Sequence, residues 1–179
     1  LCPTIVEKVE RLNKAHRHRT IGSPPVDPEQ NLAAQNLLLP KAETPAFDYL
    51  PLTMHNGTAY LAGQLAKVDG VQTNPGQVGS EIDEAEAGRQ MQLCALQSLA
   101  WLKHYLGTLQ KVERVLHLNA YVACTREFEY ISRIADHASQ VYITAFGGEN
   151  GRHARSVLGM VRLPQNAPAM IDLRVAVQA

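Results

Sequence analysis

The chain has 179 residues, 45% of them hydrophobic, and its 17 basic residues balance 17 acidic ones. This composition is typical of one globular domain and excludes a disordered chain. Because the net charge is zero, nothing in the overall balance attracts nucleic acid or an anionic membrane, and we expect neither as a partner.

Residues 1–44 are interpreted as an N-terminal extension, a helix plus a loop, and residues 45–179 as the main domain. Apolar and charged residues alternate at helical spacing over residues 4 to about 18. Pro24, Pro25 and Pro28 then exclude a regular helix or a central strand. The main domain opens with predicted strands at 47–54 and 59–65, joined by Asn56-Gly57, which is a strong hairpin signal. A short third strand is expected at 67–71.

The middle of the chain predicts two long helices. The glycine-rich loop at 73–79 lacks the lysine and Ser/Thr of a P-loop. A helix is predicted to start at Ser80 and to end at Gly107, and a second one covers residues 127–146. Cys94 falls on the apolar face of the first helix, where the pattern favours a packed core thiol over a reactive one.

Residues 112–124, between these helices, have the period of a half-buried strand. The apolar face is formed by alternate residues, Leu116, Leu118, Ala120 and Val122. The other face carries His117, Asn119 and Tyr121. These three side chains line a pocket or an oligomer interface, or they pair across the strands of a solvated sheet; the sequence leaves both readings open.

The last predicted strands cover residues 156–162 and 170–177. The resulting order of elements is typical of an α+β fold with two helices on one face of a mixed sheet. The other face is left uncovered. Since burial of apolar surface contributes roughly 25 cal/mol per Å², an uncovered sheet face of this kind favours oligomerisation.

Arg155 is the most informative candidate for a functional residue. It follows a loop rich in glycine and charge, residues 147–152, and precedes an apolar run that is predicted as a strand. An arginine held at the mouth of a strand presents a planar fork that binds a carboxylate or a phosphate. The alternative is a surface arginine in a salt bridge.

The three cysteines, Cys2, Cys94 and Cys124, lack the short paired spacing of zinc and redox motifs, so we expect free thiols in a reducing compartment and no metal site. No apolar run reaches about 18 residues, so no transmembrane helix is expected. We expect a cytoplasmic protein. A mitochondrial location stays open, since the sequence begins at Leu1 rather than at a methionine and an upstream targeting segment is compatible with that start.

Several short motifs together carry a resemblance to a known family. They are Tyr49 followed by Gly63-Gln64, then Gly79, a helix with Cys94 that closes at Leu106-Gly107, the strand from Val112 to Val122 before Phe128, and above all Ala154-Arg155-Ser156 followed by Leu163-Pro164. Over residues 47–177 the chain resembles the RidA/YjgF family, also named endoribonuclease L-PSP or translation initiation inhibitor. The His-Ala-Arg-Ser form and the N-terminal extension are similar to a longer branch of that family.

The resemblance implies a chorismate-mutase-like α+β fold of βββαβαββ type, assembled as a barrel-like homotrimer with clefts between subunits. In the family, the arginine that corresponds to Arg155 binds a substrate carboxylate, Tyr49 lines the cleft and the backbone at Gly63 adds contacts. The family reaction is hydrolysis of 2-imino or enamine acids to 2-oxo acids and ammonia, without a metal or other cofactor. The implied partners are a small carboxylate-bearing molecule and further copies of the chain.

Two positions depart from the family pattern. The water-activating glutamate of the family corresponds to Met170, which neither accepts nor donates a proton, and a family cysteine corresponds to Val157. Asp172 lies on the same strand face as Met170, about 6–7 Å further along. His153 is the candidate replacement base, since its unperturbed pKa is near 6.5. A solvent-exposed loop histidine is the alternative.

Three functions follow from this comparison. The first is a carboxylate-binding protein that hydrolyses imino or enamine acids in an intersubunit cleft. The second is a ligand sensor or structural trimer without catalysis, which the loss of the glutamate and cysteine favours. The third is an endoribonuclease or translation inhibitor, against which the neutral net charge argues.

Overall fold

The computed structural model describes residues 27–42 and 48–178, so the helix expected at residues 4–18 lies outside the described residues. The elements, in chain order, are α2 (Pro28–Ala34), β1 (Leu52–His55), β2 (Thr58–Leu65), β3 (Lys67–Val68), β4 (Val71–Gln72), α3 (Glu84–Leu106), the 3₁₀ turn η1 (Leu109–Lys111), β5 (Val112–Ala123), α4 (Ile131–Asn150), β6 (Ala154–Met160), the 3₁₀ turn η2 (Pro164–Asn166) and β7 (Ala169–Val177). None of the helices in this part of the chain is long and apolar enough to cross a membrane.

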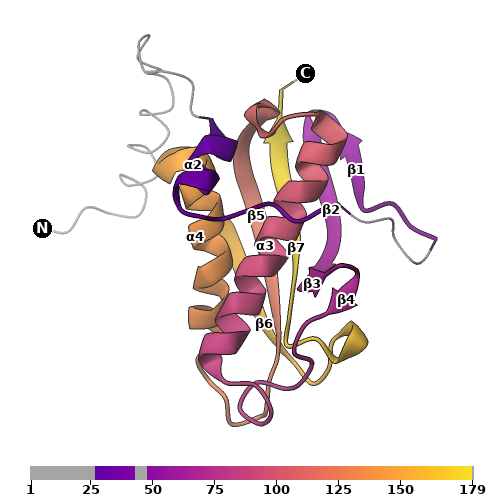
Figure 1. The fold of residues 1–179 in the computed structure, drawn as a ribbon, viewed down its shortest axis with the longest axis vertical. Helices are drawn as coiled ribbons and strands as arrows, with labels where there is room; N and C mark the ends of the chain where they lie inside the picture. Colours follow the sequence, from indigo (N-terminus) through magenta and orange to yellow (C-terminus); the bar gives the residue numbers. More distant parts are fainter. Residues whose placement is uncertain (1–26, 43–47, 179) are drawn as a thin grey trace, which may run out of the picture.

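The five-stranded sheet has the order β1-β2-β7-β5-β6. All neighbouring strands in it run antiparallel except β5 and β6, which are parallel, so the sheet is mixed as expected. Both long helices, α3 and α4, pack on the same face of this sheet (Figure 1). The single third strand predicted at 67–71 was wrong: this segment forms a separate ribbon of two short strands, β3 and β4, because Asp69 and Gly70 turn the chain with positive φ angles.

The first hairpin is confirmed, with Asn56 and Gly57 at its turn. Both residues have positive φ angles, 47° and 71°, which is the conformation that a two-residue type I′ turn requires. The first strand is shorter than predicted, since β1 begins only at Leu52.

The two long helices are confirmed, but both begin later than predicted. The first starts at Glu84, because Asp83 rather than Ser80 is its N-cap: the Asp83 carboxylate accepts the backbone N–H of Glu86 at 2.7 Å. Gly107, with φ 82°, ends this helix as expected. The second starts at Ile131 and continues past the predicted end to Asn150, with a break in helical geometry at Gly147.

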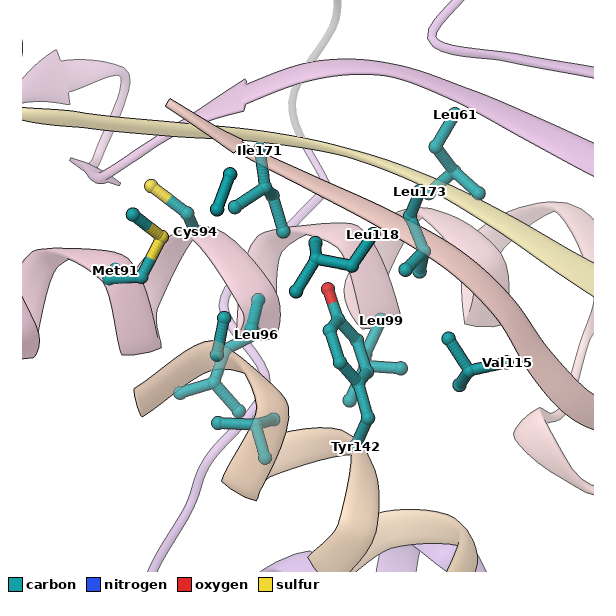
Figure 2. Packing of buried hydrophobic residues seen from close by; sticks show 14 of the residues in the cluster. Leu61, Met91, Cys94, Leu96, Leu99, Val115, Leu118, Tyr142, Ile171 and Leu173 are labelled. Atoms are coloured by element: carbon teal, nitrogen blue, oxygen red, sulfur yellow. The ribbon is translucent and has the colours of Figure 1, made fainter. Parts of the chain in front are cut away.

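The core lies between the helices and the sheet. Figure 2 shows Tyr142 of α4 among aliphatic side chains from α3 and the sheet, including Leu99, Leu118 and Leu173. Cys94 is completely buried there, which confirms the packed core thiol, and burial raises the pKa of this thiol.

The face assigned to Leu116 in β5 was wrong. The pairing of β5 with β7 shifts register between Val115 and His117, so Leu116 is the extra residue of a bulge. Its side chain is 38% exposed, whereas Val115 takes the buried position. Beyond the bulge, Leu118, Ala120 and Val122 are buried as predicted.

The short helix α2 was not predicted: it begins at Pro28, since a proline is tolerated at the first helical position, and Asp27 is its N-cap. Leu32 is buried, and the Asn31 side-chain amide donates to the Ala145 carbonyl of α4 at 3.0 Å. Lys103 of α3 forms an ion pair of 2.6 Å with Glu29. Residues 28–34 therefore pack across both long helices.

Candidate functional site

Arg155 is the second residue of β6, and its position in the sheet decides where its side chain points. It pairs with Leu118 of β5, whose side chain is buried under the helices, so Arg155 faces α4 rather than the open face of the sheet. Its Nη1 donates to Asp136 Oδ1 at 2.7 Å and to Ser139 Oγ at 3.0 Å. Nη2 reaches the Ser132 carbonyl at 3.5 Å. The salt bridge considered from the sequence is therefore present, and it lies within one chain.

The sequence interpretation missed these partners of Arg155. Ser132, Asp136 and Ser139 follow one another at spacings of four and three, so they share one side of α4. The signal was visible as polar residues at helical spacing within residues 127–146. It went unused because that segment was interpreted only through its apolar face.

His153 is joined to Arg155 through Ser139. Its Nδ1 lies 2.7 Å from the Gly151 carbonyl, which only accepts, so we assign the hydrogen to Nδ1. Nε2, 3.2 Å from Ser139 Oγ, then accepts from that hydroxyl. The ring also meets Tyr142 edge to face, with centroids 5.7 Å apart. His153 is thus half-buried with both nitrogens bonded, which contradicts the exposed loop histidine.

The surroundings of His153 favour its neutral form. Burial lowers the pKa of His153, the charge of Arg155 lowers it further, and the hydrogen bond to Gly151 opposes them. A neutral imidazole whose Nε2 already accepts from Ser139 orients that hydroxyl. The hydroxyl oxygen in turn accepts from Arg155.

Tyr49 and Gly63 lie far from Arg155 within one chain. Gly63 is in β2, and β7 and β5 separate β2 from β6, which places the two strands about 14 Å apart at the usual strand spacing. Tyr49 lies just before β1, the strand at the edge of the sheet next to β2, and its side chain is 49% exposed. A Cβ on Gly63 would lie 3.0 Å from Met170 Sδ, so glycine here lets β2 approach Met170.

The open face of the sheet carries a second polar cluster. Asp172 accepts from Tyr121 OH at 2.6 Å and from Asn119 Nδ2 at 2.9 Å. One row further along, Arg174 Nη1 donates to His117 Nδ1 at 3.0 Å. The hydrogen bond to Asp172, followed by burial, raises the pKa of Tyr121 to about 12. This is the cross-strand pairing considered for His117, Asn119 and Tyr121.

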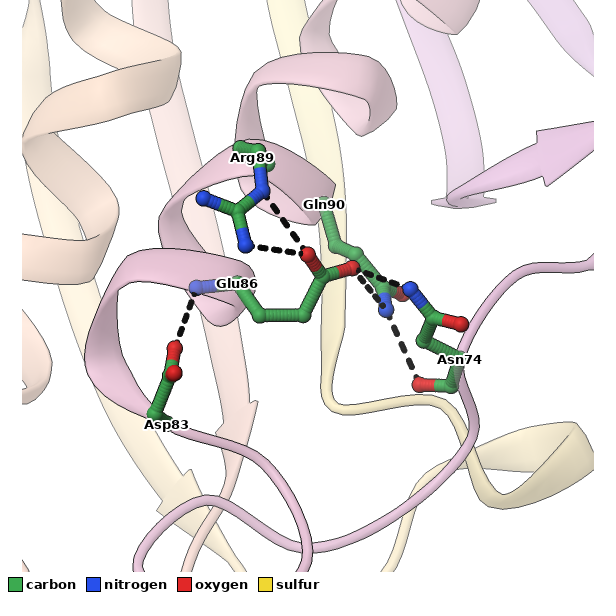
Figure 3. A network of polar contacts seen from close by, with 5 residues as sticks. All are labelled: Asn74, Asp83, Glu86, Arg89 and Gln90. Carbon is green, nitrogen blue, oxygen red and sulfur yellow. Dashed lines mark hydrogen bonds and ion pairs between the residues drawn. The ribbon is translucent and has the colours of Figure 1, made fainter.

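A third polar cluster joins the glycine-rich loop to the first turns of α3. Figure 3 shows Glu86 between Asn74 and Arg89, with Gln90 behind them. Glu86 accepts from Asn74 Nδ2 at 2.7 Å and pairs with Arg89 at 2.7 Å. The Asn74 hydrogen bond is the main reason that the pKa of Glu86 is lowered. Because these groups satisfy one another, we interpret the cluster as structural.

The sequence and the fold are similar to those of known proteins. No protein-family model matches the chain. Protein TCP17 of Trypanosoma cruzi is 34% identical over 145 residues, which are 81% of this chain and 91% of that protein. The structure of Atu1372 from Agrobacterium tumefaciens, a protein of unknown function, is 36% identical and covers 85% of this chain and 92% of its own, with a TM-score of 0.77. A candidate endoribonuclease from Shewanella oneidensis MR-1, at 24% identity, has a TM-score of 0.80 over 84% and 99% of the two chains.

The mixed sheet with both long helices on one face, and a strand-mouth arginine at its edge, define a Rid-type α+β protein. RidA from the Antarctic bacterium Psychrobacter sp. PAMC 21119 has this fold at 16% identity, with a TM-score of 0.53 over 76% of this chain and 94% of that one. Together with the relatives above, these matches show that the chain belongs to the RidA/YjgF family.

Proposed function

We propose that this protein binds a small carboxylate-bearing molecule through Arg155, in a cleft between the subunits of a homotrimer. The proposal rests on how the Arg155 guanidinium is held in place and how much of it is exposed. It is fixed on a sheet-edge strand by Asp136 and Ser139, yet its side chain remains 22% exposed. Among the described residues none accepts from Nε, and the 3.5 Å contact of Nη2 with the Ser132 carbonyl uses one of its two hydrogens, so the edge formed by Nε and Nη2 can still receive a planar carboxylate.

The two edges of the sheet support the trimer. Beside β6, Leu158, Met160 and Val161 are 42%, 37% and 88% exposed, and at the β1 edge Leu50 and Met54 are 65% and 50% exposed. Long apolar edge strands invite pairing with another chain. A head-to-tail ring of three copies would cover both edges. It would also bring Arg155 of one copy towards Tyr49 and Gly63 of the next.

The reaction that we propose for this site is hydrolysis of 2-imino or enamine acids. Water adds to C2 of the iminium acid, the C2–N bond breaks, and the products are a 2-oxo acid and ammonium. Arg155 would hold the carboxylate so that C2 has a fixed position, and such positioning contributes several kcal/mol. Family membership supports this reaction.

A non-catalytic ligand sensor is the second candidate, and it rests on the surroundings of Met170. This side chain lies with Leu65, Tyr121, Ala123, Leu163 and Ala167 in a small apolar cluster. The neighbouring carboxylate, Asp172, is already bonded to Tyr121 and Asn119. The position that corresponds to the family's catalytic glutamate is therefore apolar.

Thermal unfolding with pyruvate or benzoate tests carboxylate binding. A ligand at ten times its Kd adds about 1.4 kcal/mol to the free energy of unfolding, and so raises the Tm by about 3–6 °C. We expect this shift in the wild type and in Arg152→Ala, whose exposed arginine lies three residues away, but not in Arg155→Ala. Equal shifts in Arg155→Ala and the wild type would refute the proposal.

A coupled assay separates the enzyme from the sensor. A pyridoxal-phosphate dehydratase generates 2-aminoacrylate, and pyruvate formation is followed with lactate dehydrogenase. Faster pyruvate formation with the wild type than with Arg155→Ala supports hydrolysis. No acceleration by a wild-type protein that still binds pyruvate supports the sensor.

A further inference from the structure

We propose that Asp136 sets the charge selectivity of the Arg155 site, favouring ligands with a cationic nitrogen beside the carboxylate over plain carboxylates. The inference rests on the proposed binding of a carboxylate by Arg155. Its basis is the contact of 2.7 Å between Asp136 Oδ1 and Arg155 Nη1. A carboxylate that belongs to the protein therefore already occupies one edge of the arginine fork.

Asp136 is well placed to act on a ligand. Its side chain is 62% exposed, whereas that of Arg155 is 22% exposed, so the carboxylate lies at the solvent side of the pair. Only Oδ1 contacts Arg155, and within residues 27–42 and 48–178 no donor is bonded to Oδ2. The negative charge of Asp136 is thus offset on one side only, by Arg155, and it acts on any ligand that binds the same guanidinium.

A plain carboxylate meets opposition at this site. Bound at the edge formed by Nε and Nη2, its oxygens would lie about 6 Å from the Asp136 carboxylate, on the other side of the same guanidinium. Repulsion between two negative charges at that distance in a solvated site weakens binding about three- to tenfold. If the ligand displaced Asp136 instead, the loss of the existing ion pair would have a similar effect.

A ligand with a cationic nitrogen does not meet this repulsion. In a 2-amino or 2-iminio acid the nitrogen is bonded to the carbon beside the carboxylate. With the carboxylate on Arg155, the positive charge of this nitrogen offsets the repulsion between the carboxylate and Asp136. The ligand, with one charge of each sign, then matches a site with one charge of each sign.

This selectivity also acts on the proposed reaction. Hydrolysis of an iminio acid removes the cationic nitrogen as ammonium and leaves a 2-oxo acid, which carries only the carboxylate. Asp136 thus repels the product and leaves the substrate, with one charge of each sign, almost unaffected. A site with this charge pattern releases its product more readily than it releases its substrate.

Isothermal titration with free L-alanine and with pyruvate tests the inference, since the two differ only at C2. The variants are Asp136→Asn, which keeps the shape and removes the charge, and Asp136→Ala; exposed Glu127, replaced by Gln, is the matched control. In both Asp136 variants we expect the affinity for pyruvate to rise about three- to tenfold, and the affinity for alanine, whose net charge is zero, to change by less than about twofold. Glu127→Gln should change neither.

The outcomes separate this inference from the proposed function. If Asp136→Asn changes both affinities by the same factor, or changes neither, the selectivity role is refuted while carboxylate binding stands. If Arg155→Ala binds pyruvate as well as the wild type does, the proposed function itself fails, and the role of Asp136 fails with it. Circular dichroism of each variant verifies that the fold is retained.

Discussion

The hydrogen bond between Tyr142 and Ser98 links α4 to α3 under the candidate site, and its energy can be measured. Both side chains are completely buried, with the two oxygens 2.8 Å apart. Ser98 Oγ also lies 2.7 Å from the Ala95 carbonyl, which accepts the serine hydrogen, so Tyr142 is the donor to Ser98. Tyr142→Phe should therefore lower the free energy of unfolding by about 1 kcal/mol.

Ser98→Ala should cost more, about 1–3 kcal/mol, because it leaves the tyrosine hydroxyl buried without its partner. The double variant removes both polar groups, so its loss should be smaller than the sum of the two single losses, by about 1 kcal/mol. For a chain of this length, each kcal/mol lowers the Tm by about 2–4 °C.

Urea unfolding of the four proteins, followed by circular dichroism, measures this coupling energy. Tyr142→Phe keeps the ring that packs against His153, so the carboxylate-dependent rise in Tm should persist in this variant. Single losses that add within about 0.3 kcal/mol would show that the two hydroxyls do not interact, and would refute the reasoning.

Three further predictions concern the loop and edge around the site. Burial lowers the pKa of His153, so the imidazole takes up a proton less readily in the folded protein than in the unfolded chain. The free energy of unfolding therefore keeps its full value above about pH 6.5 and falls as the pH is lowered below that value. Urea unfolding between pH 5 and 7.5 should thus show a steeper loss for the wild type than for His153→Gln, and equal slopes would contradict this. A Cβ on Gly151 would clash with the Tyr142 carbonyl oxygen, so Gly151→Ala should cost about 1–3 kcal/mol in the same assay, whereas Gly148→Ala, where nothing lies within 4 Å, should stay within about 0.5 kcal/mol. Leu158→Lys on the edge strand β6 should reduce the mass found by light scattering to one third of the wild-type value; an unchanged mass would place the contact elsewhere.

Local signals in the sequence predicted those parts of the fold that local chemistry determines. Asn56-Gly57 has few alternatives to a type I′ turn, and Gly107 adopts the left-handed conformation that ends a helix. The first residue of α3 does not follow from the cap residues alone, because both Ser80 and Asp83 are good N-caps. The turn formed by residues 77–82 selects Asp83.

The bulge at Leu116 could not be predicted from β5 alone. Its register depends on how β7 pairs with β5 on either side, and β7 lies more than 50 residues further along the chain. Strand alternation continues the apolar pattern through Leu116, whereas the bulge moves Val115 into the core in its place.

The candidate site shows the same limit. The sequence singled out Arg155 and placed it at the start of a strand, as observed. Its partners Asp136 and Ser139 lie 19 and 16 residues earlier, so only the packing of α4 on β6 brings them together. The two alternatives considered for Arg155 are also not exclusive, since a guanidinium has enough donors for a salt bridge on one edge and a ligand on the other.

The parallel pairing of β5 and β6 determines which surroundings Arg155 has within one chain. The helix α4 connects these two strands and packs over them, so the side chains of β6 on the helix face meet α4; Val157 accordingly packs against the core. Arg155 lies on that face near the strand's beginning, with α4 on one side and β5 on another. The outer edge of β6 is the side of Arg155 that neither of these elements covers. Among the described residues that edge is unpaired, since β6 is the last strand of the sheet, and in the proposed homotrimer a second subunit would form the remaining wall of the cleft over Arg155.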